Sequence, residues 1–261
     1  MKLRLGDTWP ILKSGRYCVS LCALALMVAI ALAGDPARAQ GEKFPAPDDR
    51  SVEWELAFGG KLYDNWFAAT FQSPPVARHP LMPEAADAAS AMSWRCATCH
   101  GFDYSGGTLS RGASRAPLSV PGLAAMRGAE VSTITAYLRR PPHGYGPEQM
   151  SESAMTLLAR FVADGQHDPA QYLENGGSEA KGRPIFQGVC ISCHEADGRA
   201  YIEGEPGDLP ALGWLARNRP AQVLHKIRNG FPGADMVALR FMDAGDIADL
   251  FAYMRTLPDP E

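Results

Sequence analysis

Two copies of the motif Cys-x-x-Cys-His constrain this chain more than any other feature. The sequence reads CATCH at residues 96–100 and CISCH at residues 190–194. In this motif both thiols bond covalently to the vinyl groups of a haem, and the adjacent histidine becomes an axial ligand of the iron. If the cysteine pairs formed redox disulfides or zinc sites, the histidine that follows each pair would be a coincidence. The motifs therefore predict two covalently bound haem c groups. The residues that would hold them are Cys96, Cys99, His100, Cys190, Cys193 and His194.

The N-terminal segment, residues 1–39, predicts a secretory signal peptide. Basic residues precede the apolar run YCVSLCALALMVAIALAG, and Ala37-Arg38-Ala39 follows it as an A-x-A cleavage site. We expect cleavage after Ala39 and a periplasmic location. An uncleaved segment would instead anchor the protein in a membrane, because the apolar run is close to the length that spans a bilayer. Cys18 and Cys22 lie in this segment, so the mature chain keeps no cysteine outside the two motifs.

The charge of the mature chain argues against nucleic acid as a partner. Removing residues 1–39 takes away five basic and two acidic side chains, which leaves 20 basic and 27 acidic residues and a net charge of −7. An acidic exported protein lacks the basic surface that nucleic acids require. We expect redox partner proteins with a basic docking face, and association rates that fall as ionic strength rises.

The second half of the chain resembles a class I cytochrome c domain. Residues 179–198, EAKGRPIFQGVCISCHEADG, resemble the family's N-terminal helix leading into haem attachment. Residues 208–230, DLPALGWLARNRPAQVLHKIRNG, resemble its proline-leucine loop and the helix that follows. Residues 242–257, MDAGDIADLFAYMRTL, resemble its C-terminal helix. In the family the first and last helices cross closely, which here would bring Gly182 and Phe186 against Tyr253. The apolar side chains of residues 247–254 recur at three- and four-residue intervals, as on one face of a helix.

The first half repeats this pattern with an insertion. The Gly-x-x-x-aromatic spacing occurs again at Gly59 and Tyr63, but the stretch from Tyr63 to Cys96 is far longer than the one from Phe186 to Cys190. The insertion of about 29 residues falls mainly at residues 68–93, and its Pro, Ala and Ser content predicts a wrapping loop with a short helix. Three potential ligands lie in it and are expected to pack or to face solvent rather than bind iron: His79, Met82 and Met92.

These patterns together predict an all-α fold of two class I cytochrome c domains, each wrapping one covalently attached haem. We expect a signal peptide at residues 1–39, domain 1 at residues 40–167 and domain 2 at residues 168–261. The segment between the domains is rich in Gly, Asn and Asp, which marks the end of one helix and the start of the next domain. His167 lies in this segment and is expected to occupy an exposed turn.

The second haem needs a sixth ligand, and two methionines compete for this role. Met236 matches the position, relative to the Tyr253 helix, at which the family carries its methionine ligand. Met242 stands directly before Asp243, the expected N-cap of the last helix, where a hydrophobic residue packs against Ile247 as a staple. We therefore expect Met236 to bind the iron and Met242 to pack in the core.

The same comparison assigns a packing role to two methionines of the first half. Aligning MSESAMTLLARFV with MDAGDIADLFAYM without gaps sets Met150 over Met242 and Ser151 over Asp243. Met150 would then precede the N-cap Ser151, and Met155 would be its hydrophobic partner one turn into the helix.

A histidine lies where the ligand of the first haem is needed. Phe161 is the counterpart of Tyr253, and counting back from it by the interval that separates Met236 from Tyr253 reaches Gly144, next to His143. The two prolines before His143 favour an extended segment that could present the imidazole. We expect His143 to be the sixth ligand of the first haem. Met150 is the alternative, because it would give both haems the same ligands, and an open position is the third possibility.

Two covalently held haems in an exported protein indicate electron transfer rather than enzymatic catalysis. His/His ligation at the first haem and His/Met ligation at the second would give the first the lower potential, so electrons would pass from the first to the second. The alternatives are a cytochrome subunit of a periplasmic dehydrogenase complex and a dihaem peroxidase-like oxidoreductase. The latter needs an iron that can open to peroxide. A cysteine-ligated thiosulfate-oxidising site would need a further mature cysteine, which the sequence lacks.

Overall fold

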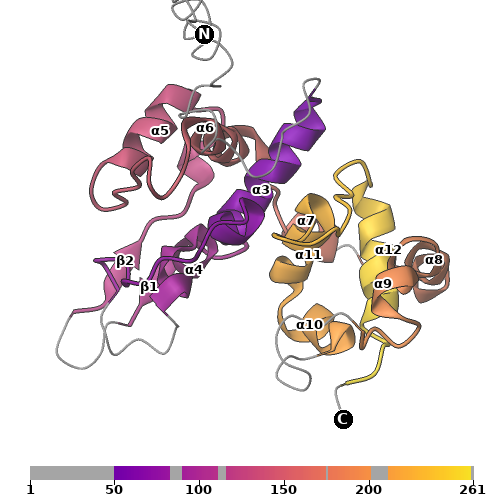
Figure 1. The fold of residues 1–261 in the computed structure, drawn as a ribbon. Coiled ribbons are helices and arrows are strands. Elements are labelled where there is room, and N and C mark those ends of the chain that lie inside the picture. The colour runs from indigo at the N-terminus through magenta and orange to yellow at the C-terminus, as the bar shows by residue number, and fades with distance from the viewer. Residues whose placement is uncertain (1–49, 83–89, 111–115, 175, 201–210, 260–261) are drawn as a thin grey trace, which may run out of the picture. The chain divides into compact units, whose positions relative to one another are not determined.

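The computed structural model describes residues 50–82, 90–110, 116–174, 176–200 and 211–259. All of them belong to one compact unit, Phe44–Glu261. This described part is predominantly helical (Figure 1). None of its helices is both long enough and apolar enough to cross a membrane. The predicted signal peptide, residues 1–39, lies outside the described residues.

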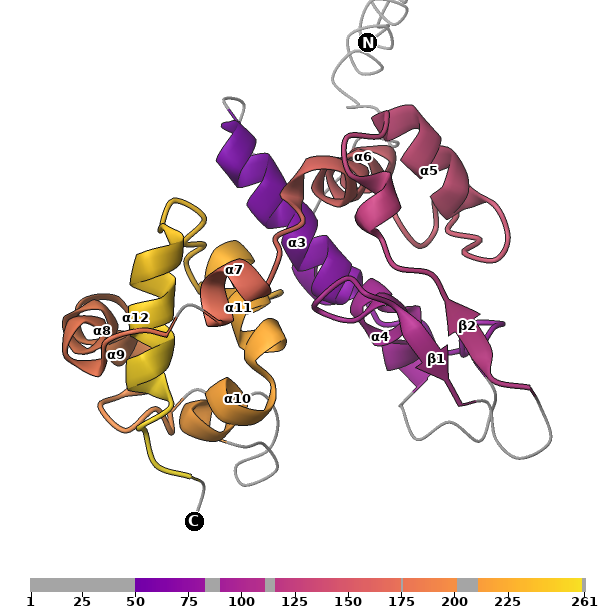
Figure 2. The ribbon, with the colours of Figure 1, turned by 180° about the vertical axis from the view of Figure 1, so that it is seen from behind.

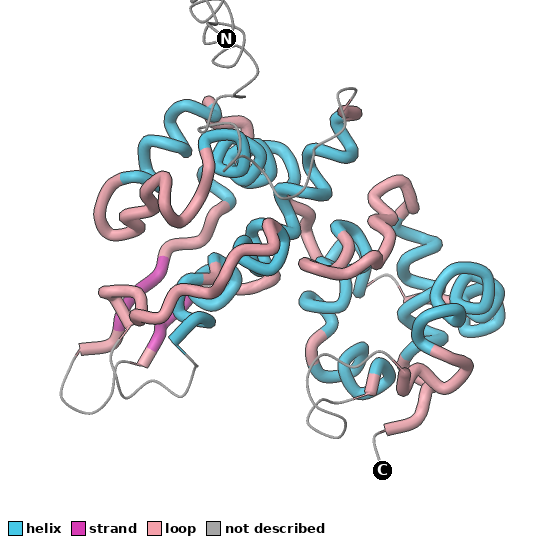
Figure 3. Tube along the Cα trace, viewed as in Figure 1, coloured by secondary structure: helices cyan, strands magenta, loops and turns pink. Residues whose placement is uncertain are grey.

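The chain up to residue 173 forms helices separated by loops. The α-helices are α3 (Val52–Ala69), α4 (Cys96–His100), α5 (Val131–Arg139), α6 (Glu152–Arg160) and α7 (Ala170–Leu173). Shorter turns are the 3-10 helices η1 (Ser90–Trp94) and η2 (Ala124–Met126) and the π-helical turn η3 (Phe161–Gly165). The short helix expected in the insertion corresponds to η1. Two strands, β1 (Gly107–Leu109) and β2 (Leu118–Val120), pair antiparallel with Gly107 opposite Val120 (Figure 3). The all-α prediction omitted this pair, because three-residue strands carry too little alternation to be recognised.

The chain from residue 179 forms a second set of helices. These are α8 (Glu179–Ile185), the π-helical turn η4 (Phe186–Cys190), α9 (Ile191–His194), α10 (Leu212–Asn218), α11 (Pro220–Asn229) and α12 (Ala244–Met254). The helices α8 and α12 lie side by side in both views (Figures 1 and 2) and make extensive contact.

The helices α3 and α6 cross closely at Gly59. A Cβ atom added to Gly59 would lie 2.6 Å from the Cβ of Phe161 and would overlap the carbonyl oxygen of Leu157. One turn further on, the rings of Tyr63 and Phe161 pack with their centroids 5.5 Å apart. The absence of a side chain at Gly59 therefore permits the close approach, as its spacing from Tyr63 predicted.

The helices α8 and α12 repeat this crossing. A Cβ atom added to Gly182 would overlap the carbonyl of Asp249 and lie 3.0 Å from the Cα of Leu250. The rings of Phe186 and Tyr253 pack with centroids 5.3 Å apart. The predicted close approach of Gly182 and Phe186 to the last helix is confirmed, and the same glycine and aromatic positions serve both helix pairs.

Side-chain caps fix where α6 and α12 begin. Ser151 and Asp243 are the N-caps, and each accepts a hydrogen bond from the backbone N–H three residues on, at 3.2 Å and 2.8 Å. Met150, just before the first cap, is 2% exposed, and Met155, one turn later, is fully buried. The predicted caps are confirmed, and the two methionines belong to one core as expected.

The described residues form two hydrophobic cores. The buried side chains of the first come from residues 62–163, and those of the second from residues 186–257. The predicted domain boundary after residue 167 falls between them and stays a prediction.

Helix α3 contributes to the first core and also contacts α11. A Cβ atom on Gly60 would lie 2.7 Å from the Cβ of Asn229, so a second glycine permits this approach.

Candidate haem sites

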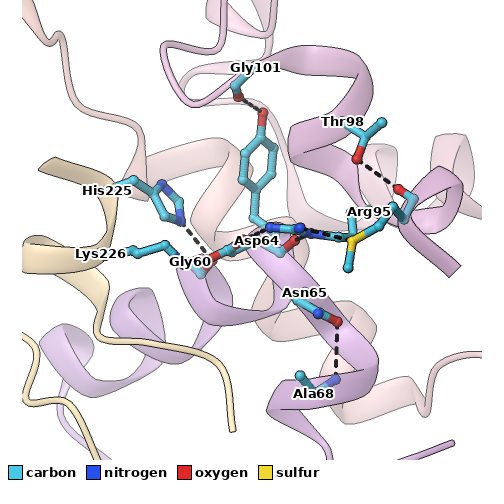
Figure 4. Close-up of polar contacts among 11 residues, drawn as sticks. Gly60, Asp64, Asn65, Ala68, Arg95, Thr98, Gly101, His225 and Lys226 are labelled. Carbon is cyan, nitrogen blue, oxygen red and sulfur yellow. Dashed lines mark hydrogen bonds and ion pairs between the residues drawn. The ribbon is translucent and has the colours of Figure 1, made fainter. Parts of the chain in front are cut away.

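The first Cys-x-x-Cys-His motif forms α4. Residues three and four positions apart lie on one face of a helix, so Cys99 and His100 share a face with Cys96. Gly101 ends the helix with φ +74°, a conformation that glycine adopts readily. Its carbonyl accepts a 2.6 Å hydrogen bond from the buried hydroxyl of Tyr63 (Figure 4). Helix α3 thereby holds the end of the motif in place.

The four motif cysteines are not joined in disulfides. Cys96, Cys99 and Cys190 are partly buried and Cys193 is exposed. Burial raises the pKa of the Cys96 thiol to about 12 and that of Cys190 to about 11. Each pair lies within one turn of its histidine, and each thiol is available for a thioether bond to a haem.

The structure places the imidazole of His143 beside that of His100. Their imidazole centroids lie 6.2 Å apart, with 23° between the ring planes. Nδ1 of His100 donates to the carbonyl of Pro121 at 3.0 Å, and Nδ1 of His143 donates to the carbonyl of Tyr137 at 3.1 Å. Nδ1 therefore carries the proton in both rings, which leaves Nε2 with its lone pair.

The separation of the two rings matches that of two imidazoles bound to one iron ion. Metal–imidazole bonds of about 2 Å on either side of an ion separate the two ring centroids by roughly 6 Å. Hydrogen bonding of Nδ1 to a carbonyl is the usual arrangement behind a metal-binding histidine, because it fixes both the tautomer and the ring orientation. Burial lowers the pKa of His100 and of His143, which favours the neutral form that binds iron.

Met150, the alternative ligand of the first haem, lies in the hydrophobic core. It is 2% exposed within the first core, and its backbone N–H donates to the carbonyl of Gly146 at 3.0 Å. It directly precedes the N-cap Ser151 and packs at the start of α6. This position agrees with the packing role predicted for it.

The second motif spans the end of η4 and α9. Cys190 is the last residue of η4, and α9 runs from Ile191 to His194. Burial lowers the pKa of His194, which again favours a neutral imidazole. Part of the surrounding chain, residues 201–210, lies outside the described residues.

Met236 lies in the loop between α11 and α12. Met236 and Met242 are both partly buried against the second core. Met242 directly precedes the N-cap Asp243, as predicted. The loop is tied to α11 by a 2.8 Å hydrogen bond from the backbone N–H of Leu239 to the carbonyl of Ile227. The assignment of Met236 as an iron ligand stays a prediction.

A buried ionic cluster lies beside the first motif, and sequence reasoning missed it. The carboxylate of Asp64 on α3 is 1% exposed and pairs with Arg95 and, at 3.0 Å, with Lys226 of α11 (Figure 4). Burial opposes ionisation of Asp64, but Lys226 and Arg95 outweigh it and lower the pKa of Asp64 below its ordinary value. Arg95 immediately precedes Cys96, so the cluster connects the start of the motif to both helices.

A second buried network joins Tyr104, His167 and His225. Nε2 of His225 donates to the carbonyl of Gly60 at 2.9 Å, so its Nδ1 accepts from the Tyr104 hydroxyl, also at 2.9 Å. The Tyr104 oxygen then accepts from Nδ1 of His167 at 3.2 Å. The expectation that His167 lies in an exposed turn is wrong: the residue is 6% exposed because it packs against Tyr104 and Tyr172.

One comparison with known proteins covers the second motif. Residues 177–254 match the model of the family described as cytochrome C oxidase, cbb3-type, subunit III. This range contains Cys190, Cys193, His194 and Met236, whereas the first motif lies outside it. The match supports a c-type cytochrome with covalently bound haem c and a role in electron transfer. No curated protein matches the chain.

Proposed function

We propose that the protein is an exported dihaem c-type cytochrome that transfers electrons between periplasmic redox partners. The observation that carries the proposal is the pair His100 and His143, whose ring centroids lie 6.2 Å apart at a Cys-x-x-Cys-His motif outside the family match. A second haem site in the first half would account for two imidazoles, each held at Nδ1 by a carbonyl, lying this close together.

Each half of the chain would hold one haem c. For the first haem the residues are Cys96, Cys99, His100 and His143, and for the second Cys190, Cys193, His194 and Met236. When bound, haem c supplies a one-electron iron couple. The carbonyls of Pro121 and Tyr137 hold the imidazoles of His100 and His143 by Nδ1–H, which would leave Nε2 of each ring available to bind the iron.

The ligand types give the transfer a direction. Thioether ligation raises the potential of a haem relative to ligation by a second imidazole. The first site should therefore have the lower potential, and electrons pass from the first site to the second and then to an acceptor. Both His100 and His143 are partly buried.

The sequence also indicates where the protein works and which partners it meets. The signal peptide, cleaved after Ala39, delivers the mature chain to the periplasm. The mature net charge of −7 favours redox partners with a basic docking face. Transfer rates to such partners should fall as ionic strength rises.

A redox titration of the purified holoprotein tests the proposal. Its absorbance should follow two one-electron steps of equal size, with the lower-potential step retained in Met236→Ala. A single haem per chain, measured after denaturation as the pyridine complex, would contradict the dihaem assignment.

A cytochrome subunit of a larger periplasmic complex is a second candidate. The description of the matching family names a subunit of an oxidase, which favours a role within an assembly. The partner expected here is a dehydrogenase, and purification of the tagged chain from its host distinguishes the two roles. A stoichiometric partner protein supports the subunit role, whereas a chain that purifies alone supports the free carrier.

A dihaem peroxidase-like oxidoreductase is the remaining alternative. Such an enzyme needs one iron that opens to peroxide, so peroxide turnover by the purified protein would favour it over the carrier. We expect no turnover, because His143 closes the first site and Met236 closes the second.

A further inference from the structure

The insertion of the first half reaches back to the His143 segment. Nε2 of His79 donates to the backbone carbonyl of His143 at 3.0 Å. His79 is 6% exposed, so the donor side of this partly buried hydrogen bond lies inside the protein. The sequence predicted that His79 packs or lies at the surface, and its ring packs edge-on against Trp94 with centroids 4.7 Å apart.

The hydrogen bonds of His79 define its tautomer. Its Nδ1 lies 3.3 Å from the backbone N–H of Leu81, which can only donate, so Nδ1 is an acceptor. The proton is therefore on Nε2, the atom that faces the carbonyl of His143. The backbone N–H of His79 also donates to Ser93 Oγ at 2.9 Å, which fixes the residue from a second direction.

A second pair of contacts supports the same segment. The hydroxyl of Tyr145 donates to the carbonyl of Trp94 at 2.6 Å. Nε1 of Trp94 donates to the carbonyl of Ala77 at 2.7 Å, within the insertion. The insertion thus contacts His143 directly through His79, and it contacts Tyr145 indirectly through Trp94, which is bonded to Ala77.

We propose that His79 is a positioning residue for the first haem: it holds the backbone of His143 so that the imidazole remains on the iron. The inference rests on the proposed function, in which His143 is the axial ligand. The ring of His143 is held at Nδ1 by Tyr137, and its backbone carbonyl by His79, so both ends of the residue are fixed. The insertion then has a role: it keeps the first iron closed to external ligands.

Carbon monoxide binding to the reduced holoprotein tests this role. Carbon monoxide binds where the distal ligand leaves the iron, so its apparent affinity and binding rate at the first haem report how firmly His143 is held. His79→Phe keeps an aromatic ring against Trp94 but removes the donor to His143. We expect carbon monoxide binding to increase on the order of tenfold, as for the loss of one hydrogen bond. If His79→Phe does not incorporate haem, His79→Leu is measured in its place.

His79→Gln is the matched control. Its side-chain amide can donate from the position of Nε2, so carbon monoxide binding should return to within a few-fold of the wild type. The methionine-to-iron charge-transfer band expected for the second haem, at the red end of the visible spectrum, should be unchanged in all three variants. An equal increase in carbon monoxide binding in His79→Phe and His79→Gln would overturn the role of the hydrogen bond, because loss of packing alone would then explain both.

His143→Ala separates this inference from the proposed function. If His143→Ala leaves the low-spin spectrum of the first haem intact, the ligand assignment fails and the inference fails with it. If His143→Ala converts the first haem to a high-spin form while His79→Phe behaves as the wild type, the ligand assignment stands and the positioning role of His79 is overturned.

Discussion

Replacing Asp64 with asparagine measures how much the buried ionic cluster stabilises the fold. The carboxylate is 1% exposed, and the paired side chains of Arg95 and Lys226 are 14% and 13% exposed. Asparagine keeps the shape but removes the negative charge, so two largely buried cations lose their counter-charge. Breaking a buried pair from one side costs about 3–5 kcal/mol. We expect the lower end, a loss of about 3 kcal/mol in the free energy of unfolding, because the amide oxygen still accepts a hydrogen bond.

Urea unfolding followed by circular dichroism at several pH values gives this free energy. The folded-state pKa of Asp64 lies below its unfolded value of about 3.9. Its contribution is therefore complete above about pH 4 and is lost as the pH falls through the folded-state pKa, so wild type and Asp64→Asn should converge in acid. Glu152→Gln, in the exposed pair with Arg139, should cost less than about 1 kcal/mol at every pH. Equal stability of Asp64→Asn and wild type at pH 7 would refute the reasoning.

Three further predictions concern packing, capping and titration. Gly182→Ala should destabilise the fold by about 3 kcal/mol in the same assay, because its Cβ would overlap the backbone carbonyl of Asp249, whereas Gly188→Ala, with open space around it, should be close to neutral. Ser151→Ala should cost about 1 kcal/mol through loss of the N-cap, and a thermal melt should show a correspondingly lower midpoint. Burial lowers the pKa of His225 to about 4, so the unfolded chain takes up this proton first as the pH falls. Stability should therefore decrease from about pH 6.5 to pH 4 by up to about 3 kcal/mol, and His225→Gln should flatten that slope.

Local patterns in the sequence predicted the helix crossings and caps correctly. Gly59 and Gly182 each precede an aromatic by four residues, and both lie where two helices touch. Ser151 and Asp243 align without gaps, and both cap their helices through the same hydrogen bond. These features depend on residues close in sequence, whose spacing alone determines which face of a helix they share.

The buried polar groups could not be predicted in this way. Asp64 and Lys226 are 162 residues apart, so the pair is invisible until α3 and α11 pack together. His167 was assigned to an exposed turn because its neighbours favour turns, but its burial is decided by Tyr104, 63 residues away. The hydrogen bond of His79 to His143 is likewise long-range, and the composition of the insertion indicated a loop without indicating what that loop would hold.

The central claim is that the protein holds two haems with different axial ligands. The most direct test is the methionine-to-iron charge-transfer band at the red end of the visible spectrum, integrated against the total haem of the oxidised protein. We expect a band for one of two haems per chain, which Met236→Ala abolishes while the first haem remains low-spin. A band that integrates to both haems would contradict the claim, since the first haem would then be bound by Met150 in place of His143.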